Sequence, residues 1–245
     1  MIKYFRKIRQ NLLTENKFGK YLTYAIGEII LVVIGILIAL SINNWNENNK
    51  LEKETNKVLL QMRDEFSRNQ NELKIKIEQH KFVKESVDEL SELVRPNPKE
   101  IEKSKLDSLM FSMIYIPAFN PSTDIASSEK LMLVDDILKN YVADWKLNYD
   151  YYKYSIKIID DSQTQQLDEF LIENYQYKNF KNELLEPNKS AFDKDRQKIL
   201  SSDIFENYVY LRSLNTGFLV KRATTLYDIQ NKIIQHIDTE LKNKK

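Results

Sequence analysis

The stretch Ala25–Ile42, which reads AIGEIILVVIGILIALSI, decides the fold. Fourteen of its 18 residues are Ala, Val, Leu or Ile, and Glu28 is its one charged residue. With the aromatic and apolar residues just before it, the run reaches the length of about 20 residues that a helix needs to cross a bilayer. The sequence therefore predicts a transmembrane helix over residues 24–42.

The residues around this helix predict how it is oriented. Tyr21 and Tyr24 lie at one end and Trp45 at the other, where aromatic side chains anchor a helix at the membrane surfaces. Residues 1–42 hold six bases and two acids, whereas the stretch just after the span, NNWNENNK, is nearly free of bases. The positive-inside rule then predicts a single-pass protein of the inner (cytoplasmic) membrane. Its basic segment, residues 1–23, would lie in the cytoplasm and residues 43–245 in the periplasm.

A cleaved signal peptide is the alternative, because Ala39-Leu40-Ser41 resembles a cleavage site. The lead before the apolar run is long for a signal peptide, however, and the run itself is longer than a usual signal-peptide core. These two features favour a retained anchor.

Small residues form a stripe along the predicted span. Gly27, Leu31, Gly35 and Ala39 recur every four residues, and small side chains on one face let a second membrane helix approach closely. Glu28 borders this stripe, and a carboxylate in an apolar run is costly and often functional. Two simpler readings stay open: glycine is common in membrane helices, and Glu28 lies about one turn from the cytoplasmic end, where it can reach the interface or Lys20.

Composition restricts the class of the remaining chain. There is no cysteine, which excludes disulfides, thiolate nucleophiles and cysteine-based zinc sites. Residues 43–245 hold 31 bases and 34 acids, so the domain lacks the basic surface that nucleic-acid binding needs. Gly217 is the one glycine beyond the span, although hairpins and phosphate-binding loops need glycine. We expect an all-α fold, with the membrane helix continuing into an antiparallel bundle of long helices.

The periodicity of apolar residues predicts the first of these helices over residues 45–94. Positions spaced alternately by three and four form a coiled-coil-like seam, and eight of the eleven are apolar. These positions are Leu59, Met62, Phe66, Asn69, Leu73, Lys76, His80, Val83, Val87, Leu90 and Val94. Pro96 and Pro98 end the helix.

Three further helices are expected. The first covers 99–114, and the second follows a cap at Ser122, Thr123 or Asp124 and continues toward residue 180. In that second helix an aromatic stripe is expected to form core; it comprises Tyr141, Trp145, Tyr149 and Tyr152. A loop is expected over 182–195, and a last helix over 203–242 with Gly217 at a kink or close helix contact.

The opening of the chain resembles a large uncharacterised single-span family of the Bacteroidetes, a domain of unknown function. The resemblance rests on FRKIR from Phe5, YAIGEI from Tyr24, VVIGILIAL from Val32 and NNWNE from Asn43. It is specific over residues 4–47 and looser beyond. It implies the membrane anchor and adds no chemistry.

Few residues offer catalytic chemistry. His80 falls on the seam between Lys76 and Lys84, which argues for a core or groove position rather than a metal ligand. His236 and Glu240 lie one turn apart, a pair insufficient for a metal site. The carboxylate pairs at 135–136 and 160–161 are expected to cap a helix or lie on a solvated face. No zincin, serine-hydrolase, P-loop or EF-hand motif occurs.

We therefore expect a non-enzymatic, membrane-anchored binding or scaffold module without cofactor or metal. Its expected partners are the lipid bilayer and either another protein or a second copy of the chain, and it could instead sense a ligand. Two alternatives remain. One is a carboxylate-based hydrolase in a bundle cleft, which would need carboxylates converging on a pocket. The other is stator-like proton coupling through Glu28.

Overall fold

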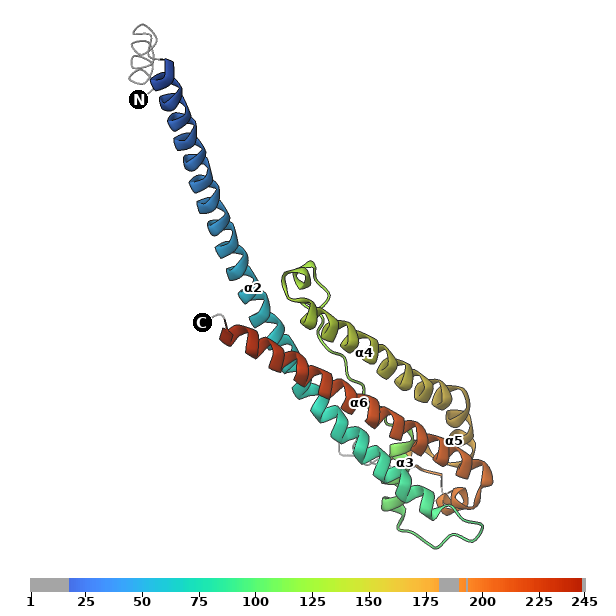
Figure 1. Cartoon of the computed structure of the whole chain (residues 1–245). Helices are drawn as coiled ribbons and strands as arrows, with labels where there is room; N and C mark the ends of the chain where they lie inside the picture. The colour runs from blue at the N-terminus through green and yellow to red at the C-terminus, as the bar shows by residue number, and fades with distance from the viewer. Residues whose placement is uncertain (1–17, 181–189, 193, 244–245) are drawn as a thin grey trace. The chain divides into compact units, whose positions relative to one another are not determined.

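The computed structural model describes residues 18–180, 190–192 and 194–243, without the side chains of residues 18, 20 and 21. Every element in these ranges is helical, and no strand occurs among them, which confirms the all-α prediction. The α-helices are α2 (Phe18–Leu93), α3 (Lys103–Ile114), α4 (Asp136–Ser162), α5 (Asp168–Asn174) and α6 (Asp203–Asn243) (Figure 1). Shorter elements are the π-helix η2 (Gln163–Leu167) and the 3-10 helices η1 (Glu129–Leu133), η3 (Tyr177–Asn179) and η4 (Arg196–Ser201).

Internal contacts divide the chain into two compact units, Met1–Asn56 and Lys57–Lys245. In the described part of the first unit, α2 carries the apolar run, and its large apolar side chains are exposed. Among the described residues α2 is the one helix long and apolar enough to cross a membrane, judged by length and composition. The sequence-based expectation of such a helix is confirmed at that level.

The second unit is built on α2, α4 and α6, which lie alongside one another over this part of the chain (Figure 1). Arg63 pairs with Asp238 near one end of α6, and Asp88 accepts from Ser213 near the other, so α2 and α6 run antiparallel. The larger core cluster draws on all three helices. Its bulkiest members are Phe66, Trp145 and Tyr152, and the predicted seam and aromatic stripe are both confirmed as core.

A second core cluster lies where α3 and α5 join the bundle. Val87 and Leu90 of α2 pack here with Met110 of α3, Leu171 of α5 and Phe205 of α6. This cluster holds the short elements against the long ones. It also includes aromatic residues from the connection after α5, where Tyr175 and Phe180 stack at 5.5 Å between ring centroids.

The predicted starts of two helices were wrong, and the helix expected to continue toward residue 180 ends at Asn174. The helix expected from residue 99 begins at Lys103, because both backbone groups of Ile101 bind the side chain of Gln197, which holds that residue outside a helix. The helix expected after Ser122 begins at Asp136, and its cap is Asp135, whose carboxylate accepts from the Leu138 N–H at 2.8 Å.

The backbone of Ser122 is used elsewhere. Its N–H and C=O both bind the side-chain amide of Asn69 on α2, at 3.0 and 2.8 Å. One turn earlier on α2, the buried carboxylate of Glu65 accepts from the N–H groups of Ile125 and Ala126 at 2.8 and 3.2 Å. These contacts fasten the connection before α4 to the core face of α2.

The last helix and the loop before it follow the prediction where they are described. Ser202 Oγ accepts from the Phe205 N–H and α6 begins at Asp203. Gly217 marks a close contact, since a Cβ there would lie 3.3 Å from Cε of Lys84. Residues 182–189 and 193 of the predicted loop lie outside the described residues.

Candidate functional site

The predicted stripe on the membrane helix is open along its length. A Cβ added to Gly27 or Gly35 would meet nothing within 4 Å, and Leu31 and Ala39 are exposed. All positions from 29 to 42 are exposed. The chain's own structure therefore leaves room for a second helix on this stripe without distinguishing the stripe from the other faces.

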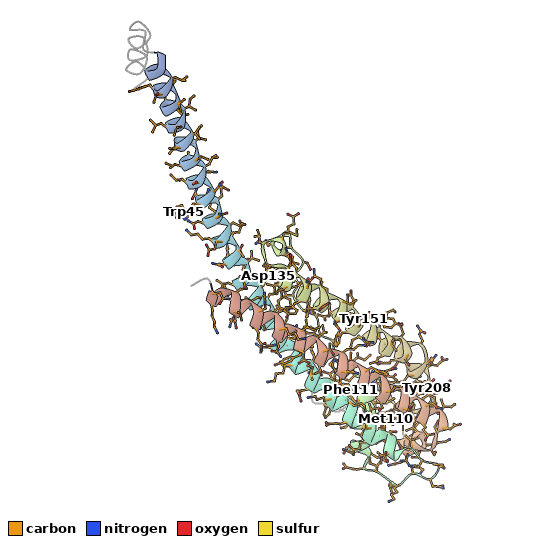
Figure 2. The ribbon with its side chains drawn as sticks, viewed as in Figure 1. Trp45, Met110, Phe111, Asp135, Tyr151 and Tyr208 are labelled. Atoms are coloured by element: carbon orange, nitrogen blue, oxygen red, sulfur yellow. The ribbon has the colours of Figure 1, made fainter. Side chains whose placement is uncertain are left out.

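The structure describes most of the residues predicted to anchor the membrane helix, and it describes Glu28, which borders the stripe. Glu28 is half-buried, while Tyr24 and Trp45 are exposed at the two ends of the apolar run. Figure 2 labels Trp45 on α2. The side chain of Tyr21 lies outside the described part of the chain. The exposed aromatic side chains fit anchoring positions at two membrane surfaces.

The second unit contains one group of potential metal ligands among its described residues. Asp135, His236 and Glu240 bring their ligand atoms within 4.8 Å of one another. His236 Nε2 lies 2.8 Å from Asp135 Oδ2, while the same carboxylate caps α4. These contacts hold the pKa of Asp135 below its usual value, against the effect of its partial burial. We interpret the group as structural: its contact holds the start of α4, marked by Asp135 in Figure 2, against the C-terminal part of α6.

His80 occupies the core position that its place on the seam predicted. Its side chain is buried, and Nε2 lies 3.0 Å from the hydroxyl of Tyr152. That hydroxyl also accepts from the Phe119 N–H at 3.1 Å, so it joins His80 to the backbone before α4. Burial, followed by the charges of Arg212 and Lys76, lowers the pKa of His80 to about 4. The geometry is that of a structural histidine.

Sequence reasoning missed Arg212. Arg212 is 7% exposed in the second unit, where its Nη2 donates to Tyr115 O at 2.6 Å and reaches Ser112 O at 3.4 Å. These carbonyls belong to the C-terminal end of α3, where a cation is favourable. Burial lowers the pKa of Arg212 to about 10. The periodicity of α6 places residue 212 on its inner face, which is the signal that could have revealed it.

The outer face of α6 carries an apolar stripe that the sequence analysis also missed. Ile204, Leu211 and Phe218 follow one another at intervals of seven residues, and Leu214 lies between the last two. Each of the four is between 42% and 54% exposed. We call these four residues the α6 stripe. A second run of exposed apolar side chains lies on α4, where Leu147, Tyr151, Tyr154 and Ile158 follow one another at intervals of three and four residues.

The chain was compared with models of known protein families. A family model described as "Family of unknown function (DUF6090)" matches residues 28–189, about two thirds of the chain. The chain belongs to DUF6090. This confirms the expectation of an uncharacterised family. No curated protein and no solved structure matches the chain.

The DUF6090 match runs from Glu28 in the apolar run through α4 and α5. It includes both ends of the contact between Glu65 and the connection before α4. Helix α6, with Arg212 and the α6 stripe, lies outside the matched residues.

Proposed function

We propose that this protein is a membrane-anchored helical docking module, held by residues 24–42 in the inner membrane with residues 43–245 in the periplasm. Its partner would be a helix of another protein, bound on the α6 stripe. The anchor is supported by the one helix among the described residues that is apolar enough to cross a membrane, and by the bases that precede it.

The observation that carries the docking role is the α6 stripe. A water-facing helix that packs on one side normally presents polar residues on the other. Here the side opposite the core presents Leu211, Leu214 and Phe218 at the spacing of a coiled-coil seam, with Ile204 seven residues before Leu211 and the polar Asn207 between them. Contiguous exposed apolar surface on a soluble domain marks an interaction site.

The spacing also indicates the class of partner. Side chains that follow one another at intervals of three and then four residues insert between the side chains of a facing helix. Leu211, Leu214 and Phe218 supply three such side chains over two helical turns. An amphipathic helix with a matching apolar face would cover them, as in other helix–groove complexes.

Photo-crosslinking in native membranes tests this proposal. A photoreactive phenylalanine analogue at Leu214 should give a discrete adduct with one protein, identified by mass spectrometry. The same analogue at Thr225, exposed on the same side of α6 but beyond the stripe, is the matched control and should not. The paired change Leu211→Glu and Phe218→Glu should remove the adduct while leaving the protein in the membrane.

Other outcomes of this crosslinking experiment would change or contradict the proposal. An adduct of twice the chain mass of 29.2 kDa would identify a second copy as the occupant instead of a different protein. Equal adducts from positions 214 and 225, or adducts that survive the paired change, would contradict docking on the α6 stripe.

A further inference from the structure

The guanidinium of Arg212 has donors that the protein does not use. Nη2 binds the carbonyls at the end of α3, but Nε and Nη1 are buried and have no hydrogen-bond partner in the chain. A buried donor without an acceptor costs about 1–3 kcal/mol, and more when the group is charged. Such a group in a native structure calls for an ion or an ordered water.

A small cavity lies against this residue. It has a volume of about 20 Å³, and its polar lining comes from Ser162, Gln163, Tyr208, Arg212 and Asn215, with apolar side chains completing the wall. Tyr208 lies on the part of α6 near α5 (Figure 2). A cavity of about 10–15 Å³ holds one water molecule, so this space fits a single guest of about that size and excludes an organic ligand.

A local irregularity builds one side of the cavity. Ser162 is the last residue of α4 and Gln163 the first of the π-helix η2, and both line the space. π-helices are rare, appear as single turns within α-helices, and occur frequently at functional sites. Gln163 Oε1, an acceptor, is also buried without a partner, and a half-turn of this amide would present its NH2 donors in place of the oxygen.

Charge determines which guest fits best. None of the described residues that line the cavity is acidic, and burial lowers the pKa of Arg212. A water molecule could accept hydrogen bonds here but would leave the buried positive charge without a counter-charge. An anion would supply both the acceptor and the charge.

We propose that this cavity is a binding site for a small monovalent anion of about the size of chloride. Arg212 holds the anion through Nε and Nη1, and the side chains of Ser162, Tyr208 and Asn215 provide further donors. The anion would join α3, η2 and α6, and so would stabilise the folded domain by mass action.

Thermal unfolding of the full-length protein in a non-ionic detergent tests the proposal. The midpoint is measured in sodium chloride and in sodium gluconate, whose anion is too large for the cavity, at equal ionic strength. At chloride about four to five times the Kd, wild type should unfold about 2–4 °C higher than in gluconate. Arg222→Gln, which removes a cation elsewhere on α6, is the matched control and should keep this difference.

Two variants should lose the chloride effect. Arg212→Gln removes the charge, and Asn215→Leu keeps the charge but replaces a polar wall with an apolar one. Chloride-35 NMR provides a measure that does not depend on unfolding: wild type and Arg222→Gln should broaden the chloride line, and added bromide should reverse this. Asn215→Leu should broaden it less, and this comparison decides the question if Arg212→Gln does not fold.

Equal midpoints in chloride and gluconate for wild type would overturn the proposal. An equal chloride effect in wild type and Asn215→Leu, or chloride broadening that bromide does not reverse, would also overturn it. The cavity would then hold water only.

Discussion

The two parts of α2 carry similar apolar side chains in opposite surroundings. In the first unit Leu31 is 67% exposed and its apolar neighbours are exposed all around the helix, whereas in the second unit Leu59 and Phe66 are fully buried. Apolar residues cover all sides of the first part, but they recur every three or four residues in the second. One helix thus shows two patterns suited to two solvents: lipid for the first part, and a protein core for the second.

The largest effect is expected where the second part of α2 packs. Phe66 is fully buried and meets Trp145 edge-to-face at 5.2 Å between ring centroids. Phe66→Ala should therefore lower the free energy of unfolding by about 3–5 kcal/mol, measured by chemical denaturation in detergent. Leu60→Ala, at an exposed position of the same helix, should change it by less than about 0.5 kcal/mol. Equal losses from both variants would mean that the seam is not the core face.

A charge placed in the apolar run of α2 tests whether lipid surrounds that part of the helix. Val33→Lys puts an ammonium at the middle of the apolar run and should cost about 2.5–3.5 kcal/mol of membrane insertion. Less protein should then remain in membranes washed at alkaline pH. Leu60→Lys adds the same charge in the second unit and should leave that fraction unchanged. If both variants remain fully membrane-bound, residues 24–42 do not form the anchor.

The features set by local sequence were predictable. Pro96 and Pro98 fix the end of α2, and Ser202 fixes the start of α6. The three-four spacing identified the buried face of α2, including the polar Asn69 and His80. Each of these conclusions needs only residues within a few turns of one another.

The features that depend on distant partners were not predictable. Glu65 is buried because it binds backbone N–H groups about 60 residues away, and no spacing rule predicts that pairing. Asp135 rather than Ser122 caps α4, and the backbone of Ser122 instead binds the distant side chain of Asn69. The cavity beside Arg212 depends on where α3, η2 and α6 meet.

Acid should weaken the second unit through His80. Its pKa is about 4 in the folded protein and about 6.5 when unfolded, so the unfolded state binds more protons between these values. Stability should be unaffected above about pH 6.5 and should fall by up to about 3 kcal/mol as the pH drops to 4. Urea unfolding at pH 7.5 and pH 4.5 measures the change. His80→Gln should flatten this dependence, and an unchanged slope would assign it to other groups.

The smallest effect is expected on the stripe of the membrane helix. Gly35→Ile should weaken association with another helix by about 1 kcal/mol, roughly fivefold, because the side chain holds the backbones apart. Crosslinking in native membranes measures the yield, with Ile36→Leu on another face as the control. Glu28→Gln lowers the yield only if the carboxylate pairs with a partner's cation. Equal yields from all variants would make this segment a plain anchor.

The most direct test of the whole account uses the absence of cysteine from the chain. Single cysteines are placed on either side of the span, by Lys7→Cys and Asn48→Cys, and labelled with a membrane-impermeant maleimide in cells with an opened outer membrane. The account predicts that the cysteine at 48 is labelled at once and that the cysteine at 7 is labelled only after the inner membrane is broken. Labelling in the reverse order, or a mature chain that has lost residue 7, would contradict a retained anchor with its helical domain in the periplasm.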